Sequence, residues 1–267
     1  MWVICPEQFI VKVPYTPEGF IGARRLREKG VRINFTLEFS ARQNALVTIV
    51  AKPDYLNVFL GRIGAFIADN QLGDGSGAGE NAVLSSQMWV KRMSGSNQWP
   101  TKQIAASLRN YTQLDLLAGT DVYTMPPKVA AAGHISLTGI FNNRLGTHYD
   151  VPLNETAKNL GIEKFWEVPQ SVIELGRSLD RYMPATGEDL VARVHAAGLG
   201  DMFPRMSKDD NERIAAEGKI PVLSSWRDRI ISGELACDTM LTLAGIASFT
   251  SDQRQLDDRI RGILVKD

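Results

Sequence analysis

The sequence has little cysteine and no excess of charge of either sign. Its 267 residues include two cysteines, Cys5 and Cys237, far apart and without a Cys-x-x-Cys motif. That spacing argues against a disulfide framework and a structural zinc site, and it predicts a reducing, cytoplasmic setting. The 30 basic and 30 acidic side chains balance to a net charge of zero. Because nucleic-acid binding requires a basic surface that contacts phosphates, nucleic acid is excluded as an expected partner.

Long apolar runs are also missing. No stretch approaches 18 consecutive apolar residues, so we expect no membrane-spanning helix and no membrane partner. The three histidines, His134, His148 and His195, offer no complete set of metal ligands, and no P-loop motif is found. We therefore predict neither a metal nor a cofactor. The glycine-rich segment 73–79 follows no predicted strand, so we interpret it as a flexible loop rather than a nucleotide site.

Strand and helix signals alternate over the first half of the chain. Thr16-Pro17-Glu18 has the order of an N-cap, a proline at the first helical position and an acid in the first turn, and Gly30 suits the end of that helix. The predicted strands are 9–14, 31–39, 55–60, 103–108 and 121–125. The predicted helices between and after them are 17–30, 41–50, 81–93, 111–118 and 127–132. This alternation is typical of a parallel α/β sheet with right-handed crossovers.

The second half has mainly helical signals. Residues 134–143 are a mixed stretch that we expect to include extended chain, and the helices expected after it are 171–183, 187–195, 208–217, 223–231, 236–246 and 251–264. We therefore divide the chain into a partial (β/α) barrel at 1–132 and a mostly α-helical extension at 133–267.

The faces of the strands favour a (β/α)8 TIM-type barrel over a doubly wound sheet. A doubly wound sheet has strands that are apolar on both faces. Here a more polar row alternates with an apolar row, as expected for a barrel with a functional mouth. The rows predicted to face inward are Arg32, Asn34 and Thr36; Tyr55, Asn57 and Phe59; and Gln103, Ala105 and Ser107. The opposite rows are Val31, Ile33 and Phe35; Leu56, Val58 and Leu60; and Ile104, Ala106 and Leu108.

Lys12 is the candidate nucleophile. It lies near the carboxyl end of an apolar strand, where catalytic groups of barrels gather. Burial disfavours the ammonium form of a lysine, and the neutral amine attacks carbonyl carbons to form Schiff bases. The alternative interpretation is a lysine that extends from a strand end into water.

Neutral polar residues and arginines are predicted near the same rim. Asn34, Thr36 and Asn57 could orient substrate hydroxyls and a water molecule, or could simply be satisfied polar groups at strand ends. Arg62 and Arg109 each follow a strand and would suit a phosphate through paired, charge-assisted hydrogen bonds. Two surface arginines at helix starts are the simpler alternative.

Four ordered motifs together resemble the transaldolase family. They are Lys12-Val13-Pro14-Tyr15-Thr16-Pro17-Glu18-Gly19, Gly30-Val31-Arg32-Ile33-Asn34-Phe35-Thr36-Leu37-Glu38-Phe39-Ser40, Phe59-Leu60-Gly61-Arg62-Ile63 and Ala106-Ser107-Leu108-Arg109-Asn110. The resemblance covers about residues 9–132, and it implies a (β/α)8 barrel in which Lys12 forms the Schiff base with a ketose phosphate. It further implies that Asn34 and Thr36 handle substrate and catalytic water and that Arg62 and Arg109 bind the sugar phosphate. Asn57 stands where the family usually has a serine.

The resemblance also leads us to expect a truncated protein. In the family the lysine is on the fourth strand, so three preceding βα units, with the acidic residues on the first and third strands, have no counterpart here. About five βα units remain. The first hypothesis is a transaldolase of the pentose phosphate pathway, which transfers a dihydroxyacetone unit between fructose 6-phosphate and erythrose 4-phosphate, with aldol cleavage as a variant. The second is a catalytically impaired sugar-phosphate-binding or assembly protein, and the third is a helical interaction module. A homo-oligomer is possible under each.

Overall fold

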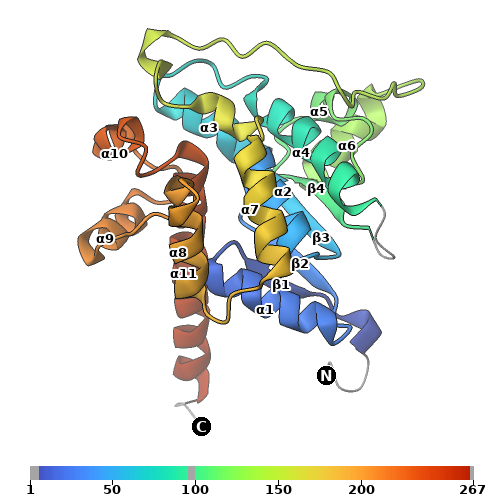
Figure 1. The fold of residues 1–267 in the computed structure, drawn as a ribbon. Coiled ribbons are helices and arrows are strands. Elements are labelled where there is room, and N and C mark those ends of the chain that lie inside the picture. The colour runs from blue at the N-terminus through green and yellow to red at the C-terminus, as the bar shows by residue number, and fades with distance from the viewer. Residues whose placement is uncertain (1–5, 96–99, 265–267) are drawn as a thin grey trace.

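The chain forms one parallel sheet with helices packed against it (Figure 1). The computed structural model describes residues 6–95 and 100–264, so Cys5 lies outside the described residues. The sheet has five strands in the order β1-β2-β3-β4-β5, and every neighbouring pair is parallel. The strands are β1 (Val11–Pro14), β2 (Ile33–Thr36), β3 (Tyr55–Phe59), β4 (Lys102–Ala106) and β5 (Val122–Thr124).

The helices connect the strands and then form a long helical second half. The helices of the first half are α1 (Pro17–Glu28), α2 (Ala41–Val50), α3 (Leu60–Asp69), α4 (Ala78–Ser94), α5 (Thr112–Leu116) and α6 (Pro127–Ser136). Those of the second half are α7 (Gln170–Arg181), α8 (Gly187–Ala196), α9 (Lys208–Glu217), α10 (Arg227–Ile231) and α11 (Cys237–Leu264). Short 3-10 turns are η1 (Pro6–Gln8), η2 (Glu155–Ala157), η3 (Ile162–Phe165), η4 (Gly200–Met202) and η5 (Leu223–Ser225).

The first two helices each have a side-chain cap at the N-terminal end, and the cap at Thr16 is the predicted one. The Thr16 hydroxyl accepts a hydrogen bond from the backbone N–H of Gly19, and Ser40 does the same for Gln43. The Gln43 side chain turns back toward the start of its helix, where its oxygen accepts a hydrogen bond from the backbone N–H of Phe39, the residue before the cap Ser40. Both helices are therefore fixed at their N-terminal ends by side-chain oxygens, directly after a strand.

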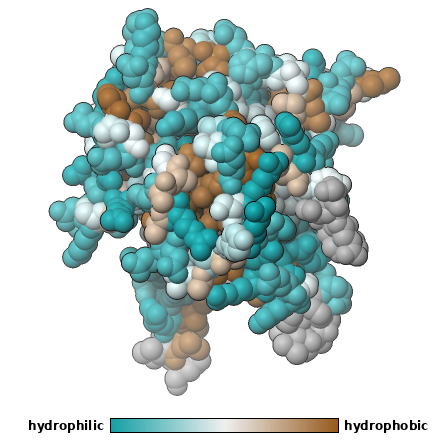
Figure 2. Space-filling model, viewed as in Figure 1, coloured by the Kyte–Doolittle hydropathy of each residue, from teal (hydrophilic) through white to brown (hydrophobic). Residues whose placement is uncertain are grey.

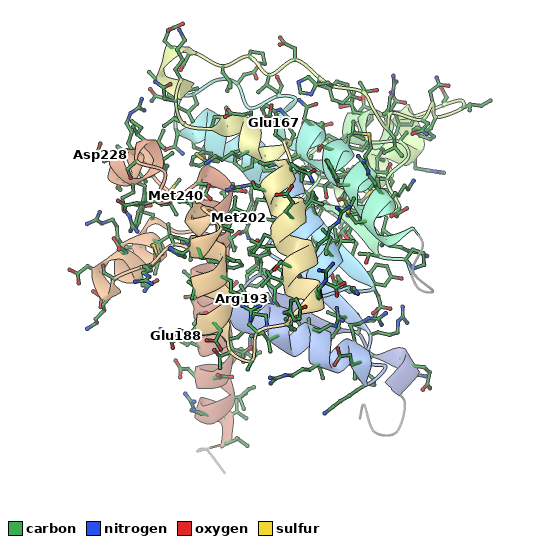
Figure 3. All side chains as sticks on the ribbon, viewed as in Figure 1. Glu167, Glu188, Arg193, Met202, Asp228 and Met240 are labelled. Atoms are coloured by element: carbon green, nitrogen blue, oxygen red, sulfur yellow. The ribbon has the colours of Figure 1, made fainter. Side chains whose placement is uncertain are left out.

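Two buried apolar clusters hold the sheet and the helical second half together. One includes residues of β3, β4, α3, α4 and α11, and the other includes residues of β2, α1, α2, α7 and α8, with Val13 of β1 packed against it. Met240 belongs to the first cluster and Met202 to the second, and both are fully buried (Figure 3). Each cluster thus combines residues from both halves of the chain. Helix α7 packs along α2, and α8 packs against α1 (Figure 1).

The polar face of the sheet differs from the predicted one at β4. The pairing of Asn57 with Ile104 and of Phe59 with Ala106 puts Ile104 and Ala106, not Gln103 and Ala105, on the face that carries Asn57. Gln103 lies on the opposite face, where its side chain bonds to Ser86 and to the carbonyl of Val83 in α4. The prediction for this strand was wrong because the polar Gln103 is satisfied inside the helix layer. For β2 and β3, the pairing of Asn34 with Tyr55 agrees with the predicted rows.

Three predicted elements also differ from the observed ones. Helix α3 was missed because it begins at Leu60 directly after β3, with no side-chain cap at Phe59. The expected extended stretch 134–143 is the end of α6 followed by irregular chain without a strand. The two helices expected at 236–246 and 251–264 are one helix, α11, in which the Thr250 hydroxyl bonds to the Ile246 carbonyl instead of capping a new start. Among the described residues, no helix is long and apolar enough to cross a membrane.

A buried ion pair fixes the N-terminal part of α11 to α2. Arg42 is 2% exposed, and its Nε and Nη2 donate to the two carboxylate oxygens of Asp238 at 2.8 and 2.7 Å. Arg42 Nη1 donates to Asp201 at 2.9 Å, and the Ser40 hydroxyl donates to Asp238 at 2.6 Å. Arg42 holds the pKa of Asp238 below its ordinary value despite the opposing effect of burial.

Substituting Asp238 should reveal this anchor. Breaking a buried ion pair typically costs about 3–5 kcal/mol, and because Arg42 keeps Asp201 as a partner, we expect Asp238→Asn to lower the free energy of unfolding by about 3 kcal/mol, the lower end of this range. Urea unfolding at neutral pH measures it. The matched control is Asp258→Asn, which removes an exposed pair with Arg261 and should leave the unfolding midpoint unchanged. Equal midpoints for both variants would show that the buried pair does not anchor α11.

Candidate functional site

The carboxyl ends of the first three strands form a polar row. Lys12 in β1 is paired in register with Asn34 in β2, and Pro14 is paired with Thr36. The side-chain amide of Asn57 in β3 donates to Asn34 Oδ1 at 2.8 Å and to the carbonyl of Phe35 at 2.6 Å. The structure therefore brings Lys12, Asn34 and Asn57 together across three neighbouring strands.

Lys12 is not buried in the described structure. Its side chain is exposed on the edge strand, so the expected burial of the amine was wrong for the described residues. One group from the helical half does reach it, because Lys12 Nζ lies 5.7 Å from the centre of the Phe249 ring on α11. That distance is within the range of a cation–π contact.

Arg62 and Arg109 lie close together at the adjacent part of the rim. Arg62 is in the first turn of α3, and Arg109 follows β4. A Cβ added at Gly61 would be 2.6 Å from Arg109 Nε and 2.2 Å from the Ser107 carbonyl, so Gly61 lets the loop after β4 approach α3. Burial, together with the charge of Arg109, lowers the pKa of Arg62 below its ordinary value. The two guanidinium groups therefore lie close to each other, and their binding of a phosphate stays a prediction.

Helix α11 covers this part of the rim. A Cβ at Gly245 would be 2.8 Å from Leu37 and 3.5 Å from Arg62 Nη1, which places the helix directly over both residues. Arg62 Nη1 is buried without a hydrogen-bond partner among the described residues. The carboxylate of Asp252, about two turns further along α11 than Gly245, is near enough to oppose the fall in the pKa of Arg62. The helical half thus contributes Phe249, Gly245 and Asp252 to the surroundings of the predicted site.

Glu38 is a buried acid that sequence reasoning did not single out. It follows β2 two residues after Thr36, with Leu37 between them in a left-handed conformation (φ +73°). The two carboxylate oxygens of Glu38 have no hydrogen-bond partner among the described residues. The same is true of the Thr36 hydroxyl. Burial raises the pKa of Glu38 well above its ordinary value, while the backbone N–H groups of Glu38 and Asn57, and after them the charge of Lys12, act in the opposite direction. An acid within the apolar sequence Phe35 to Phe39 was the signal that could have revealed it.

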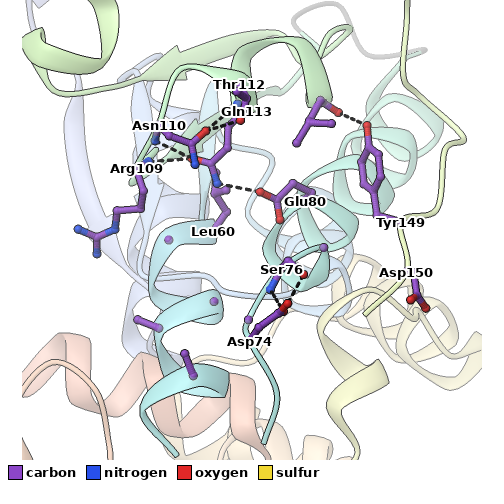
Figure 4. Close-up of a pocket in the computed structure, with 17 residues that line it drawn as sticks. Leu60, Asp74, Ser76, Glu80, Arg109, Asn110, Thr112, Gln113, Tyr149 and Asp150 are labelled. Atoms are coloured by element: carbon purple, nitrogen blue, oxygen red, sulfur yellow. Dashed lines mark hydrogen bonds between the residues drawn. The ribbon is translucent and has the colours of Figure 1, made fainter. Parts of the chain in front are cut away.

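Arg109 also lines a cavity of about 700 Å³ beside α3 and α4 (Figure 4). In this cavity the Gln113 side chain donates to Glu80 at 2.7 Å, and Asp74 accepts from Ser76. The glycine-rich loop approaches the chain around Asp150 closely: a Cβ at Gly77 (φ +74°) would be 2.3 Å from the Asp150 carbonyl. Within residues 6–95 and 100–264, no group of three or more metal-ligating His, Cys, Asp or Glu side chains forms.

Comparisons with known proteins give a consistent family. The family model described as Transaldolase/Fructose-6-phosphate aldolase matches residues 1–164. A "Probable transaldolase" of Thermus thermophilus is 38% identical over 125 residues, which are 46% of this chain and 49% of that protein. A "Probable transaldolase" of Aquifex aeolicus is 34% identical over 46% of this chain and 51% of its own length. A "Transaldolase" of Prochlorococcus marinus is 26% identical over 81% of this chain and 61% of its own length. The chain spans about half the length of the first relatives it matches.

The burial of Glu38 predicts a particular dependence of stability on pH. Because the folded state holds the proton of Glu38 above the ordinary pKa of 4.5, the unfolded state binds fewer protons there, and stability falls as the pH rises above 4.5. Glu38→Gln should remove this fall, so its gain in stability over the wild type should be larger at pH 8 than at pH 4. Urea unfolding across this range tests it. Glu188→Gln, at an exposed position on α8 (Figure 3), is the control and should follow the wild type. A parallel pH dependence of Glu38→Gln and wild type would contradict the assignment.

Proposed function

The chain belongs to the transaldolase/fructose-6-phosphate aldolase family, and we propose that it transfers a dihydroxyacetone unit between sugar phosphates through a Schiff base on Lys12. Within this proposal the five parallel strands are part of a TIM-type barrel, and 1–132 is the part that carries the chemistry. The observation that supports this proposal is that Lys12 is paired in register with Asn34 at the same rim of the sheet at which Arg62 and Arg109 lie close together.

The proposed reaction begins with addition of the Lys12 nitrogen to the ketone carbon of a ketose phosphate. Loss of water gives an iminium. The C4 hydroxyl then loses its proton, the electron pair of the C3–C4 bond moves toward the iminium to form an enamine, and the aldose phosphate leaves as an aldehyde. The three-carbon enamine on Lys12 adds to an acceptor aldehyde, and hydrolysis of the resulting iminium releases the new ketose phosphate and the free amine. Asn34 and Asn57 lie beside Lys12 and orient substrate hydroxyls, whereas Thr36 at the strand end holds the water of the hydrolytic step. The enzyme class is thus a transferase of aldehyde or ketone groups.

The phosphate end of the substrate is assigned to the two arginines. Each guanidinium can donate two parallel hydrogen bonds to phosphate oxygens, and a bound dianion would relieve the repulsion between Arg62 and Arg109. Arg62 Nη1 has no partner among the described residues, which leaves a donor free for such an anion. In this assignment the carboxylate of Asp252, on α11, competes with the bound phosphate for interaction with Arg62.

One observation favours the second hypothesis, a sugar-phosphate-binding protein with impaired turnover. Lys12 is exposed, and an exposed lysine lacks the desolvation that makes the neutral amine available. Under this hypothesis the arginines still bind phosphate, but no covalent adduct forms at Lys12. The two functions therefore differ in whether a covalent adduct with the sugar phosphate forms on Lys12.

Reductive trapping separates them. We expect the 267-residue chain, treated with fructose 6-phosphate and borohydride, to gain the mass of a reduced adduct, with peptide mapping placing it on Lys12. Lys12→Ala should gain no mass under the same conditions. Lys102→Ala, which removes an exposed lysine from β4, is the matched control and should still form the adduct. An unchanged mass of the folded wild-type chain would contradict transfer through Lys12 and leave the binding function.

Substitution of Arg62 tests the phosphate assignment. Loss of charge-assisted hydrogen bonds typically costs about 1.5–3 kcal/mol, so Arg62→Ala should weaken the binding of fructose 6-phosphate roughly 10- to 100-fold. Binding of unphosphorylated fructose should not change. Calorimetric titration with both sugars measures the difference, and Arg254→Ala, at an exposed position on α11, controls for general loss of positive charge. An equal effect on both sugars would show that Arg62 does not recognise the phosphate.

A further inference from the structure

A chain of buried hydrogen bonds leads from α4 to the loop that carries Arg109 (Figure 4). The Glu80 carboxylate, in the first turn of α4, accepts from the side-chain amide of Gln113 in α5 at 2.7 Å. The amide oxygen of Gln113 accepts from the backbone N–H of Arg109 at 2.7 Å and from that of Asn110 at 3.4 Å. Glu80 is 8% exposed and Gln113 is 7% exposed, so these bonds are largely shielded from water.

The partners of Gln113 require a side chain that accepts at one atom and donates at another. Its oxygen faces backbone N–H groups, whereas its NH2 group faces a carboxylate oxygen. An ionised carboxylate at this position could not donate to Glu80. The carboxylate of Glu80 also decides which way the amide faces, because its oxygens accept hydrogen bonds and do not donate them. Glu80 therefore orients Gln113, and Gln113 holds the N–H of Arg109.

The loop after β4 is otherwise exposed and turns sharply. Ser107, the first residue after β4, has a φ of +68°, a left-handed conformation that residues with a side chain rarely adopt. Leu108 is buried, whereas Arg109 and Asn110 are exposed. The N–H of Arg109 is thus held by a buried side chain although the residue itself faces solvent.

Helix α4 also packs against the turn that carries Arg62. A Cβ added at Gly79 would be 2.5 Å from the Leu60 carbonyl and 2.9 Å from Leu60 Cβ, so α4 lies directly against the first residue of α3. Arg62 lies two residues further along the same turn. Helix α4 therefore supports both arginine-bearing segments, the start of α3 by direct packing and the loop of Arg109 through Gln113.

We propose that Gln113 is a positioning residue of the candidate phosphate site and that Glu80 orients it. This inference rests on the proposed function, in which Arg62 and Arg109 bind the phosphate of the substrate. The guanidinium of Arg109 extends away from Glu80 (Figure 4), so the two charges are not paired with each other. By holding the backbone of Arg109, Gln113 keeps the guanidinium beside Arg62 before the substrate binds. A site arranged in advance binds more tightly, because less ordering is required on binding.

Calorimetric titration of Gln113→Ala with fructose 6-phosphate and with unphosphorylated fructose tests the inference. One hydrogen bond corresponds to a factor of up to about ten in affinity, so we expect about tenfold weaker binding of fructose 6-phosphate and unchanged binding of fructose. In the Arg109→Ala background, Gln113→Ala should have no further effect, because it acts through Arg109. A general loss of folded protein would affect both sugars alike, so the ratio of the two affinities reports the positioning.

Gln87→Ala is the matched control. Gln87 is a buried glutamine of α4 that donates to the Asp121 carboxylate at 2.8 Å and accepts from the Asp121 N–H at 3.0 Å. It supports the loop before β5, at the opposite end of the sheet from Arg109. Its substitution should therefore leave the ratio of the two affinities unchanged.

An exchange of the two side chains tests the role of Glu80. Gln113→Glu alone sets two carboxylates against each other and should weaken the binding of fructose 6-phosphate at least as much as Gln113→Ala. Adding Glu80→Gln restores a donor facing an acceptor, in reversed order, and leaves an oxygen for the N–H of Arg109. The double variant should recover most of the wild-type affinity.

The outcomes separate this inference from the function on which it rests. A wild-type chain that binds both sugars equally overturns the phosphate assignment and the role of Gln113 with it. A wild-type preference for fructose 6-phosphate that persists in Gln113→Ala, or a full further loss in the Arg109→Ala background, overturns the role of Gln113 alone. Failure of the exchanged pair to recover the affinity overturns the role of Glu80. Gln113→Met, which fills similar space without these hydrogen bonds, provides the same test where the alanine variant does not fold.

Discussion

The buried ion pair between Arg42 and Asp238 is the contact on which the arrangement of the site depends. It joins α2, which follows β2, to the first turn of α11, and the rest of α11 then runs over the ends of the strands. Contacts of α11 with Leu37, Arg62 and Lys12 all lie beyond this anchor. A paired charge is costly to bury, but its fixed geometry specifies one position for the helix. The helical half is thereby part of the site.

Sequence reasoning could predict much of the sheet because its signals are local. Thr16 caps its helix where expected, and Lys12, Asn34 and Asn57 fall on one face through simple alternation. It failed where a distant partner decides the outcome. Gln103 resembles an inward polar residue until Ser86 and Val83 of α4 are seen to satisfy it. Likewise, Ser251 and Asp252 resemble a helix start, but α11 continues through them.

The candidate site likewise has residues that local sequence signals predict and residues that only the tertiary structure reveals. The family motifs pointed to Lys12 and the two arginines, and the structure places Arg62 beside Arg109. No periodicity could show that Phe249 lies over Lys12, because the two residues are joined only through the tertiary path of α11. Nor could it show that Lys12 is exposed and Glu38 buried, since both follow from which elements cover the ends of β1 and β2. The exposed apolar side chains Leu256, Ile260, Ile263 and Leu264 at the free end of α11 (Figure 2) are a further feature that only the fold makes visible.

The most direct test of the account is a crystal structure of the 267-residue chain after borohydride reduction with fructose 6-phosphate. The account predicts continuous electron density from Lys12 Nζ to the sugar carbon C2. In crystals soaked without reduction, it predicts the phosphate between Arg62 and Arg109. An unmodified Lys12, with the sugar phosphate bound instead in the cavity beside Glu80, would contradict it.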